Sequence, residues 1–279
     1  METVFTPSRV RLRRHASRSG PLNWLLFPGG PGIGSESLAE LADALRVPGD
    51  LWLVDLPGDG SNIDGVPAPD DCYARWPQVL LEAAEAVENP VCIGHSTGGM
   101  YLLSVPELER RIRGLALVST APDAGWKPRF VAMTELHPLP EVERTTAIYI
   151  ADRTNENLRD IAVASAEWNF TPGSLAAGRD LLARMPYNYA AVEWSDRHFD
   201  DTYAHSWWPA RLPVLILAGA EDRIVSQHGW DDPRFGGRNV LRASIPGGGH
   251  FPWIENPAGV AEAFGRLAAR MLEPASAPQ

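Results

Sequence analysis

A serine flanked by glycines is the residue whose setting most clearly predicts chemistry. Gly94-His95-Ser96-Thr97-Gly98 has the pattern G-x-S-x-G and directly follows the apolar run Val91-Cys92-Ile93. Between a buried strand and a helix, this pattern makes a turn so sharp that the serine adopts a strained backbone conformation and exposes its hydroxyl. Glycine is needed two positions to either side, because a Cβ there would strike neighbouring backbone. We therefore predict that Ser96 is a nucleophile; the alternative is a glycine-rich turn with an incidental serine.

A serine nucleophile needs a base, and the base needs an acid to orient it. The apolar run Val214–Leu217 leads into Asp222, and the last predicted strand, Leu241–Ile245, leads into a glycine-rich loop ending at His250. Chains with such an elbow carry the acid and then the histidine after late strands, in that order. We expect Asp222 to orient His250 and His250 to take the proton of Ser96.

Other acids and histidines compete for these roles. Glu221 is one residue nearer the strand than Asp222 and is expected to point elsewhere, while Asp123, after the strand Leu115–Val118, stays open as an alternative acid. His95 adjoins the serine, but adjacent residues on a tight turn diverge, so it is expected to pack beside the elbow. Three more histidines, His137, His198 and His205, are expected on the surface or lid. No metal site is predicted, because no pair of these histidines has the spacing of metal ligands together with a third partner.

The glycine-rich segment Pro28–Gly34 could also belong to a dinucleotide-binding site, because it follows a predicted strand and Asp55 ends the next predicted strand. The spacing is unsuitable, since Ser35 stands where the dinucleotide motif has a small apolar residue and Pro31 lacks an N–H for a pyrophosphate. The Gly-Lys-Ser/Thr signature of a P-loop is absent from the sequence. No cofactor is predicted.

Apolar runs that alternate with amphipathic segments predict a mostly parallel sheet covered by helices on both faces, an α/β fold. Ser37 and Glu40 are expected to form a capping box, and Asn256 to cap a final helix with Pro257 at its first position. The expected strands are 9–14 at a sheet edge, 22–27, 51–54, 91–93, 115–118, 213–217 and 241–245. The expected helices with an apolar stripe are 38–45, 76–87 and 260–271, and a further helix is expected over 98–105, after the serine.

Residues 121–212 break this alternation and hold half of the ten tryptophans. They are expected to form a helical cap inserted between late strands of a core made of residues 1–120 and 213–279. Residues 273–279 are expected to be a disordered end.

The composition limits the classes of partner. The chain has 279 residues, of which 44% are hydrophobic and 22% are charged. Its net charge is −10 and it has no block of five like charges, so we do not expect it to bind nucleic acid. Two cysteines cannot form a disulfide scaffold, which favours a reducing compartment. Neither a signal peptide nor a membrane helix is visible, so a cytoplasmic protein without a membrane partner is expected. Oligomeric state is not predicted.

With these residues in view, the chain resembles the α/β-hydrolase fold family from Leu22 to Met271. The resemblance implies that Ser96, Asp222 and His250 form a catalytic triad, that the backbone N–H groups of Gly30 and Thr97 form an oxyanion hole, and that 121–212 is a cap. It rests on five segments in order: Gly29-Gly30-Pro31-Gly32, Asp55-Leu56-Pro57-Gly58-Asp59-Gly60-Ser61, Gly94 to Gly99, Gly219-Ala220-Glu221-Asp222, and Gly249-His250-Phe251 with Glu255 and Pro257.

The loop Gly29–Gly32 is also similar to the HGGPG motif of prolyl iminopeptidases, but three positions depart from that group. Pro28 replaces the histidine, Pro57 stands where the peptidases' D-x-R-G motif has arginine, and Thr97 replaces the tryptophan after the serine. An aminopeptidase would need cap carboxylates for the substrate amine. The candidates are Glu167 and Glu193, beside Trp168 and Trp194, which could wall a pocket; the alternative is that both acids are solvated helix residues.

The leading prediction is a serine hydrolase that cleaves a small carboxylic ester or amide through an acyl-enzyme. The alternatives are an aminopeptidase similar to prolyl iminopeptidases, and a C–C bond hydrolase, lyase or acyltransferase on the same scaffold. A binding protein that retains the fold without catalysis is disfavoured by the presence of all three triad residues. An elbow serine also disfavours haloalkane dehalogenases and epoxide hydrolases of this fold, which use aspartate there.

Overall fold

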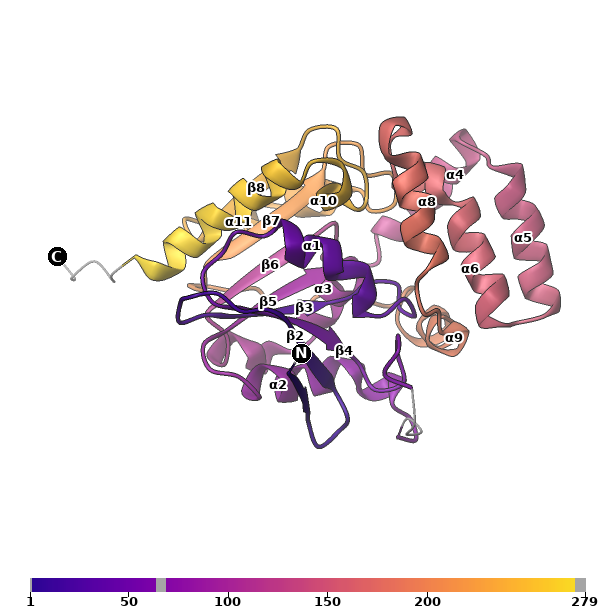
Figure 1. Ribbon diagram of the computed structural model, residues 1–279. Helices are drawn as coiled ribbons and strands as arrows, with labels where there is room; N and C mark the ends of the chain where they lie inside the picture. The colour runs from indigo at the N-terminus through magenta and orange to yellow at the C-terminus, as the bar shows by residue number, and fades with distance from the viewer. Residues whose placement is uncertain (1, 64–68, 274–279) are drawn as a thin grey trace.

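The computed structural model describes residues 2–63 and 69–273, and in them the chain forms one mixed sheet flanked by helices (Figure 1). The strand order is β1-β2-β4-β3-β5-β6-β7-β8; the pairs that involve β2 are antiparallel and all the others are parallel. This confirms the expected mostly parallel sheet. The strands are β1 Thr3–Phe5, β2 Arg11–Ala16, β3 Asn23–Phe27, β4 Asp50–Asp55, β5 Pro90–His95, β6 Gly114–Val118, β7 Val214–Gly219 and β8 Val240–Ile245.

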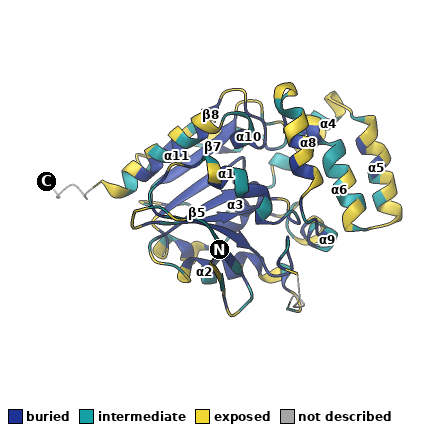
Figure 2. Cartoon of the chain, viewed as in Figure 1, coloured by how far each residue is buried: buried dark blue, intermediate teal, exposed yellow. Residues whose placement is uncertain are grey.

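Helices cover both faces of the sheet because the central strands are apolar on both sides. Figure 2 shows these strands as buried, with exposed residues on the outer faces of the helices. Alternate residues of the central strands β3 to β7 join opposite core clusters: Trp24 packs with α1 and α11, whereas Leu25 packs with α2 and α3. The helices of the core are α1 Ala39–Ala44, α2 Trp76–Glu85, α3 Thr97–Leu102, α10 Pro252–Glu255 and α11 Pro257–Leu272.

A helical region is inserted between β6 and β7 and lies at one end of the sheet (Figure 1). Its helices fall within the expected span 121–212. They are more exposed than the core, and α4 and α6 have no buried residue. The six helices are α4 Trp126–Leu136, α5 Pro140–Ala151, α6 Asn155–Ala164, α7 Ala166–Asn169, α8 Leu175–Ala183 and α9 Tyr189–His198. Whether this region acts as a cap stays a prediction.

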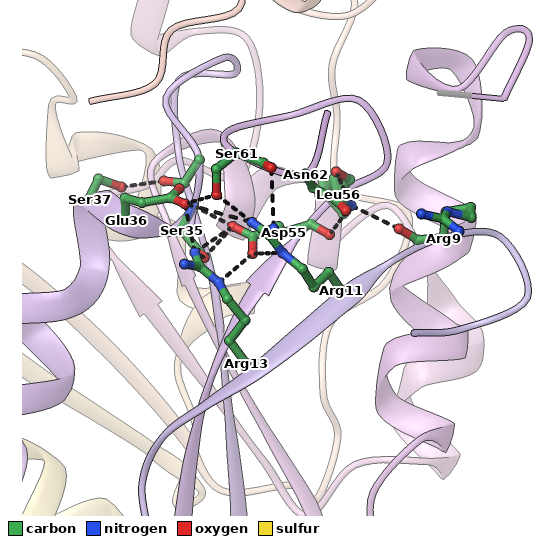
Figure 3. A network of polar contacts seen from close by, with 11 residues as sticks. Arg9, Arg11, Arg13, Ser35, Glu36, Ser37, Asp55, Leu56, Ser61 and Asn62 are labelled. Carbon is green, nitrogen blue, oxygen red and sulfur yellow. Dashed lines mark hydrogen bonds and ion pairs between the residues drawn. The ribbon is translucent and has the colours of Figure 1, made fainter. Parts of the chain in front are cut away.

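The prediction of an edge strand at 9–14 was wrong, because β1 pairs with β2 and lies outside it. The arginines of β2 instead meet a buried acid at the end of β4 (Figure 3). Nε of Arg11 and Nε of Arg13 donate to Oδ2 of Asp55 at 3.0 and 2.9 Å, and the Asp55 side chain is fully buried. Arg13 also donates to Glu36 at 2.8 Å. The period-two pattern of β2 therefore reflects ion pairing to the next strand rather than solvent exposure.

The capping box at Ser37 and Glu40 was also wrong. The helix is preceded by a 3-10 turn over Ser35–Leu38, so Ser37 lies inside the helical segment and its Oγ donates to the carbonyl oxygen of Gly34. Glu40 forms an ion pair with Arg184 of the inserted region. The apolar stripe of this segment was correct, since Leu38, Leu41, Ala42 and Leu45 are all buried.

The start of the last helix follows the prediction. Asn256 accepts a hydrogen bond from the N–H of Gly259 at 3.0 Å, and Pro257 is the first helical residue. The short helix α10 before it was not predicted, because its four residues are too few to show a periodic pattern. The expected disordered end lies outside the described residues from 274 onward.

Candidate active site

Ser96 lies at the turn between β5 and α3. Its backbone has φ of +50° and ψ of −124°, a conformation that costs a non-glycine residue energy and that concentrates at functional sites. The N–H of Ser96 donates to the carbonyl oxygen of Val118 on the neighbouring strand, at 2.9 Å. The residue is thus held in its unusual conformation by the sheet.

Two glycines make this turn possible. A Cβ on Gly94 would come within 2.5 Å of the backbone of Gly99, and a Cβ on Gly98 would strike the carbonyl oxygens of Phe27 and Pro28. Both collisions involve backbone, which cannot move aside. The spacing of glycine around Ser96 therefore has the physical cause expected from the sequence.

The histidine and the acid proposed from the sequence are in contact. Nδ1 of His250 lies 3.1 Å from Oδ2 and 3.2 Å from Oδ1 of Asp222. The Asp222 carboxylate also accepts the N–H groups of Ile224 and Val225 at 2.9 and 3.0 Å, which fixes its orientation. Both side chains are almost completely buried, at 6% and 1% exposure. Asp222 can thus fix which nitrogen of the ring carries the proton.

The competing acids lie elsewhere. Asp123 accepts the N–H of Gly125 at 2.8 Å and pairs as an isolated bridge with Ala204. Glu221 is exposed on the surface beside Arg223. Asp222 is the acid that the structure places against His250.

The backbone groups expected to form an oxyanion hole lie on facing segments. Gly30 has φ of +106°, in the loop after β3, and Thr97 is the first residue of α3. Oγ1 of Thr97 donates to the carbonyl oxygen of Gly30 at 2.9 Å, so the two segments are joined. Within the described part of the chain, the backbone N–H of neither residue has an acceptor, which leaves both available to an incoming oxygen.

These residues share one cavity of about 200 Å³. Ser96 and His250 line it together with Gly30 and Thr97. Most of its other lining residues are apolar, and the described residues that line it include no Asp, Glu, Lys or Arg; they are Ile33, His95, Met100, Trp126, Ala162, Ser165, Asn169, Leu182, Tyr187, Ile224, Val225 and Phe251. The site can therefore enclose a small, uncharged group beside the serine hydroxyl.

His95 packs beside the elbow, as expected, and also contacts the histidine loop. Its Nε2 lies 3.0 Å from the carbonyl oxygen of His250. Because a carbonyl can only accept, Nε2 carries the proton, and Nδ1 is left as an acceptor. Burial, reinforced by the neighbouring His250, lowers the pKa of His95 well below its ordinary value. His95 is therefore a neutral donor that supports the loop.

Asp59 is a buried carboxyl group that the sequence analysis quoted only as part of a motif. Burial raises its pKa to about 7, and the negative charges of Asp55 and Glu36 act in the same direction. The backbone N–H groups of Gly60 and Gly32 act in the opposite direction and lower the pKa.

The four residues proposed for a substrate pocket do not line the cavity at Ser96. Glu167 is half-exposed and pairs with Arg179 at 3.1 Å. Trp168 is buried, and its indole Nε1–H donates to the carbonyl oxygen of His137 at 2.8 Å. Glu193 pairs with Arg153 and Arg197. Trp194 packs beside His198, with ring centroids 5.4 Å apart.

A larger cavity, of about 680 Å³, lies between α4 and strands β7 and β8. It borders Asp222 but not Ser96, Gly30 or Thr97, which line the smaller cavity. Within residues 2–63 and 69–273 there is no cluster of three His, Cys, Asp or Glu side chains suited to a metal ion. The helices of those residues are all too short or too polar to cross a membrane.

Residues 17–263 match the model of the alpha/beta hydrolase family. The chain belongs to the alpha/beta hydrolase family. Among curated alpha/beta hydrolase relatives, it is 28% identical over 248 residues to a pimeloyl-[acyl-carrier protein] methyl ester esterase of Xanthomonas oryzae pv. oryzae, covering 83% of this chain and 89% of that one. The esterase of the same name from Xylella fastidiosa strain M12 is 25% identical over 237 residues, covering 78% and 84%.

Solved structures of other proteins share the fold of this chain. A proline iminopeptidase-related protein from Thermus thermophilus superposes with a TM-score of 0.72 at 21% identity, over 97% of this chain and 98% of that one. The esterase RhEst1 from Rhodococcus sp. ECU1013 superposes with a TM-score of 0.67 at 18% identity, over 97% and 98%. At these identities the likeness establishes the alpha/beta hydrolase fold alone.

Proposed function

We propose that this alpha/beta hydrolase is a serine esterase that cleaves a small, uncharged carboxylic ester through an acyl-enzyme at Ser96. The observation that carries the proposal is the arrangement around the cavity. A serine in a strained turn shares the cavity with His250, and the ring of His250 is held by Asp222 at 3.1 Å. These are the three roles that nucleophilic acyl transfer requires.

In this mechanism Ser96 Oγ attacks the ester carbonyl carbon while Nε2 of His250 takes the hydroxyl proton. The N–H groups of Gly30 and Thr97 bind the oxygen that becomes negative, and each such donor lowers the barrier by about 3–4 kcal/mol. His250 then returns the proton to the departing alcohol. Water, deprotonated by the same ring, releases the acid from Ser96, and Asp222 stabilises the ring each time it is charged.

The lining of the cavity supports a neutral substrate over an aminoacyl amide. A substrate with a free ammonium group needs a carboxylate beside it, because an unpaired buried charge is costly. The described lining residues contain no carboxylate, and Glu167 and Glu193 are paired with arginines outside the cavity. The names of the curated relatives, which are methyl ester esterases, support the same choice of bond.

The test is a panel of nitrophenyl esters of increasing chain length beside aminoacyl arylamides, together with labelling by a fluorophosphonate. We expect hydrolysis of short esters, little cleavage of arylamides, and labelling that is lost in Ser96→Ala. Arylamide turnover above ester turnover would replace the esterase by an aminopeptidase. Labelling that persists in a folded Ser96→Ala protein would show that another residue is the nucleophile.

A further inference from the structure

Glu255, the last residue of α10, joins two segments that are far apart in the sequence. Its Oε1 accepts the N–H of Thr171 at 2.6 Å and the O–H of Thr171 at 2.7 Å. Its Oε2 accepts the N–H of Gly249, the residue before His250. Thr171 follows α7 in the inserted helical region. One carboxylate thus bridges the inserted region and the loop that carries His250.

Two further contacts lie beside this bridge. The N–H of His250 donates to the carbonyl oxygen of Asn169 at 2.8 Å. The rings of Phe170 and Phe251 are stacked, with centroids 5.1 Å apart and an interplanar angle of 19°. Three consecutive residues of the inserted region, Asn169 to Thr171, therefore contact the histidine loop and the last residue of α10 through backbone, aromatic ring and carboxylate.

The histidine loop needs such support because of its composition. Gly247, Gly248 and Gly249 precede His250, and glycine loses more conformational freedom on ordering than any other residue. Gly249 also has no space for a side chain, because a Cβ there would collide with the carbonyl oxygen of Asn169. The two segments can therefore approach each other this closely because residue 249 is glycine.

We propose that Glu255 is a positioning residue, which holds His250 in place by tying its loop to the inserted helical region through Thr171. The proposal rests on the esterase function proposed above, in which His250 is the base. Glu255 touches neither the cavity nor the reacting atoms. Its effect is to keep the ring within reach of Ser96 and Asp222, and a displacement of the ring by about 1 Å can cost about 10²-fold in rate.

The test compares Glu255→Gln with a matched control, Glu262→Gln, at an exposed position of α11. Glutamine preserves the volume of Glu255, but its NH₂ group must face either the donors of Thr171 or the N–H of Gly249. Because a donor cannot accept from another donor, one side of the bridge is lost. We expect kcat to fall by about 10²-fold with KM within about twofold. The rate of fluorophosphonate labelling is expected to fall with kcat, and Glu262→Gln to behave like the wild type.

A spectroscopic measurement separates positioning from stability. The far-downfield proton resonance of the His250 Nδ1–H, held by Asp222, is expected to broaden or disappear in Glu255→Gln at temperatures well below its unfolding. It needs no substrate, so it tests the bridge even where ester hydrolysis fails. A variant that loses only thermal stability, with wild-type kcat and resonance, would overturn the proposal.

A second variant covers the case in which Glu255→Gln does not fold. Thr171→Val removes the O–H donor and keeps the N–H, so it is expected to lower kcat and labelling below the wild-type values, but by less than about 10²-fold. Thr171→Ser, which keeps both donors, should restore the wild-type rate. Wild-type kcat and resonance in Thr171→Val would overturn the assignment of the inserted region to the bridge.

Discussion

Nε2 of His95 lies 3.0 Å from the carbonyl oxygen of His250, so the residue before the proposed nucleophile supports the residue proposed as its base. Replacement of His95 by phenylalanine keeps a ring among Phe251 and Trp253 but leaves this buried carbonyl without its donor. We expect the free energy of unfolding to fall by about 1–3 kcal/mol, measured by urea denaturation, and kcat to fall with it. His95→Gln, which retains a donor, is the control. Unchanged stability in His95→Phe would contradict this role.

Asp222→Asn should reduce kcat by about 10⁴-fold, the loss expected when the acid no longer sets the correct tautomer of the histidine. Steady-state kinetics with a short nitrophenyl ester measure it. Asp123→Asn serves as the matched control, because Asp123 follows the neighbouring strand and contacts Gly125 instead of His250. A greater loss in Asp123→Asn than in Asp222→Asn would move the orienting role to Asp123.

Glu167→Gln and Glu193→Gln should have equal, small effects on esters and arylamides, because both acids pair with arginines outside the cavity. Partly exposed pairs of this kind contribute about 1 kcal/mol or less to stability. The measurement is kcat/KM for both substrate types. Selective loss of arylamide cleavage in either variant would restore the aminopeptidase alternative.

Asp59 should make the stability of the folded protein depend on pH. An aspartate has a pKa near 4 in an unfolded chain, and burial raises that of Asp59 to about 7. The folded state then binds more protons between these values, so this residue makes the free energy of unfolding fall as pH rises from about 4 to about 7. Asp59→Asn should flatten that part of the profile in urea titrations, and Asp180→Asn, at an exposed position, should leave it unchanged. A profile that keeps its slope in Asp59→Asn would sink this assignment.

Much of the fold was predictable because its signals are local. The buried strands are continuous apolar runs, and the glycines around Ser96 are required by contacts with residues close in sequence or on the next strand. That Asp222 and His250 lie close together could be inferred, because each follows a strand of a parallel sheet and the carboxyl ends of parallel strands lie at the same edge. Their catalytic roles remain predictions.

The contacts that depend on tertiary packing were not predictable in the same way. The pairing of Arg11 and Arg13 with Asp55 joins positions 44 and 42 residues apart, and it made an inner strand look like an exposed edge. Glu255 and Thr171 are separated by 84 residues, and no local sequence pattern at either residue predicts contact with the other. Glu167 and Glu193 could be proposed for a pocket because a helix sequence does not say which side faces the core.

The insertion between β6 and β7 also affects how the chain can fold while it is being synthesised. Strand β6 is buried along its whole length, yet its neighbour β7 begins at residue 214, 96 residues after β6 ends at 118. At roughly 5–20 residues per second, a ribosome needs about 5–20 s to supply that neighbour. Throughout this interval the backbone N–H and C=O groups of β6 on its β7 side have no partner strand, and such an edge can pair with another chain and aggregate. The helices of the insertion emerge during the same interval, before the sheet is complete.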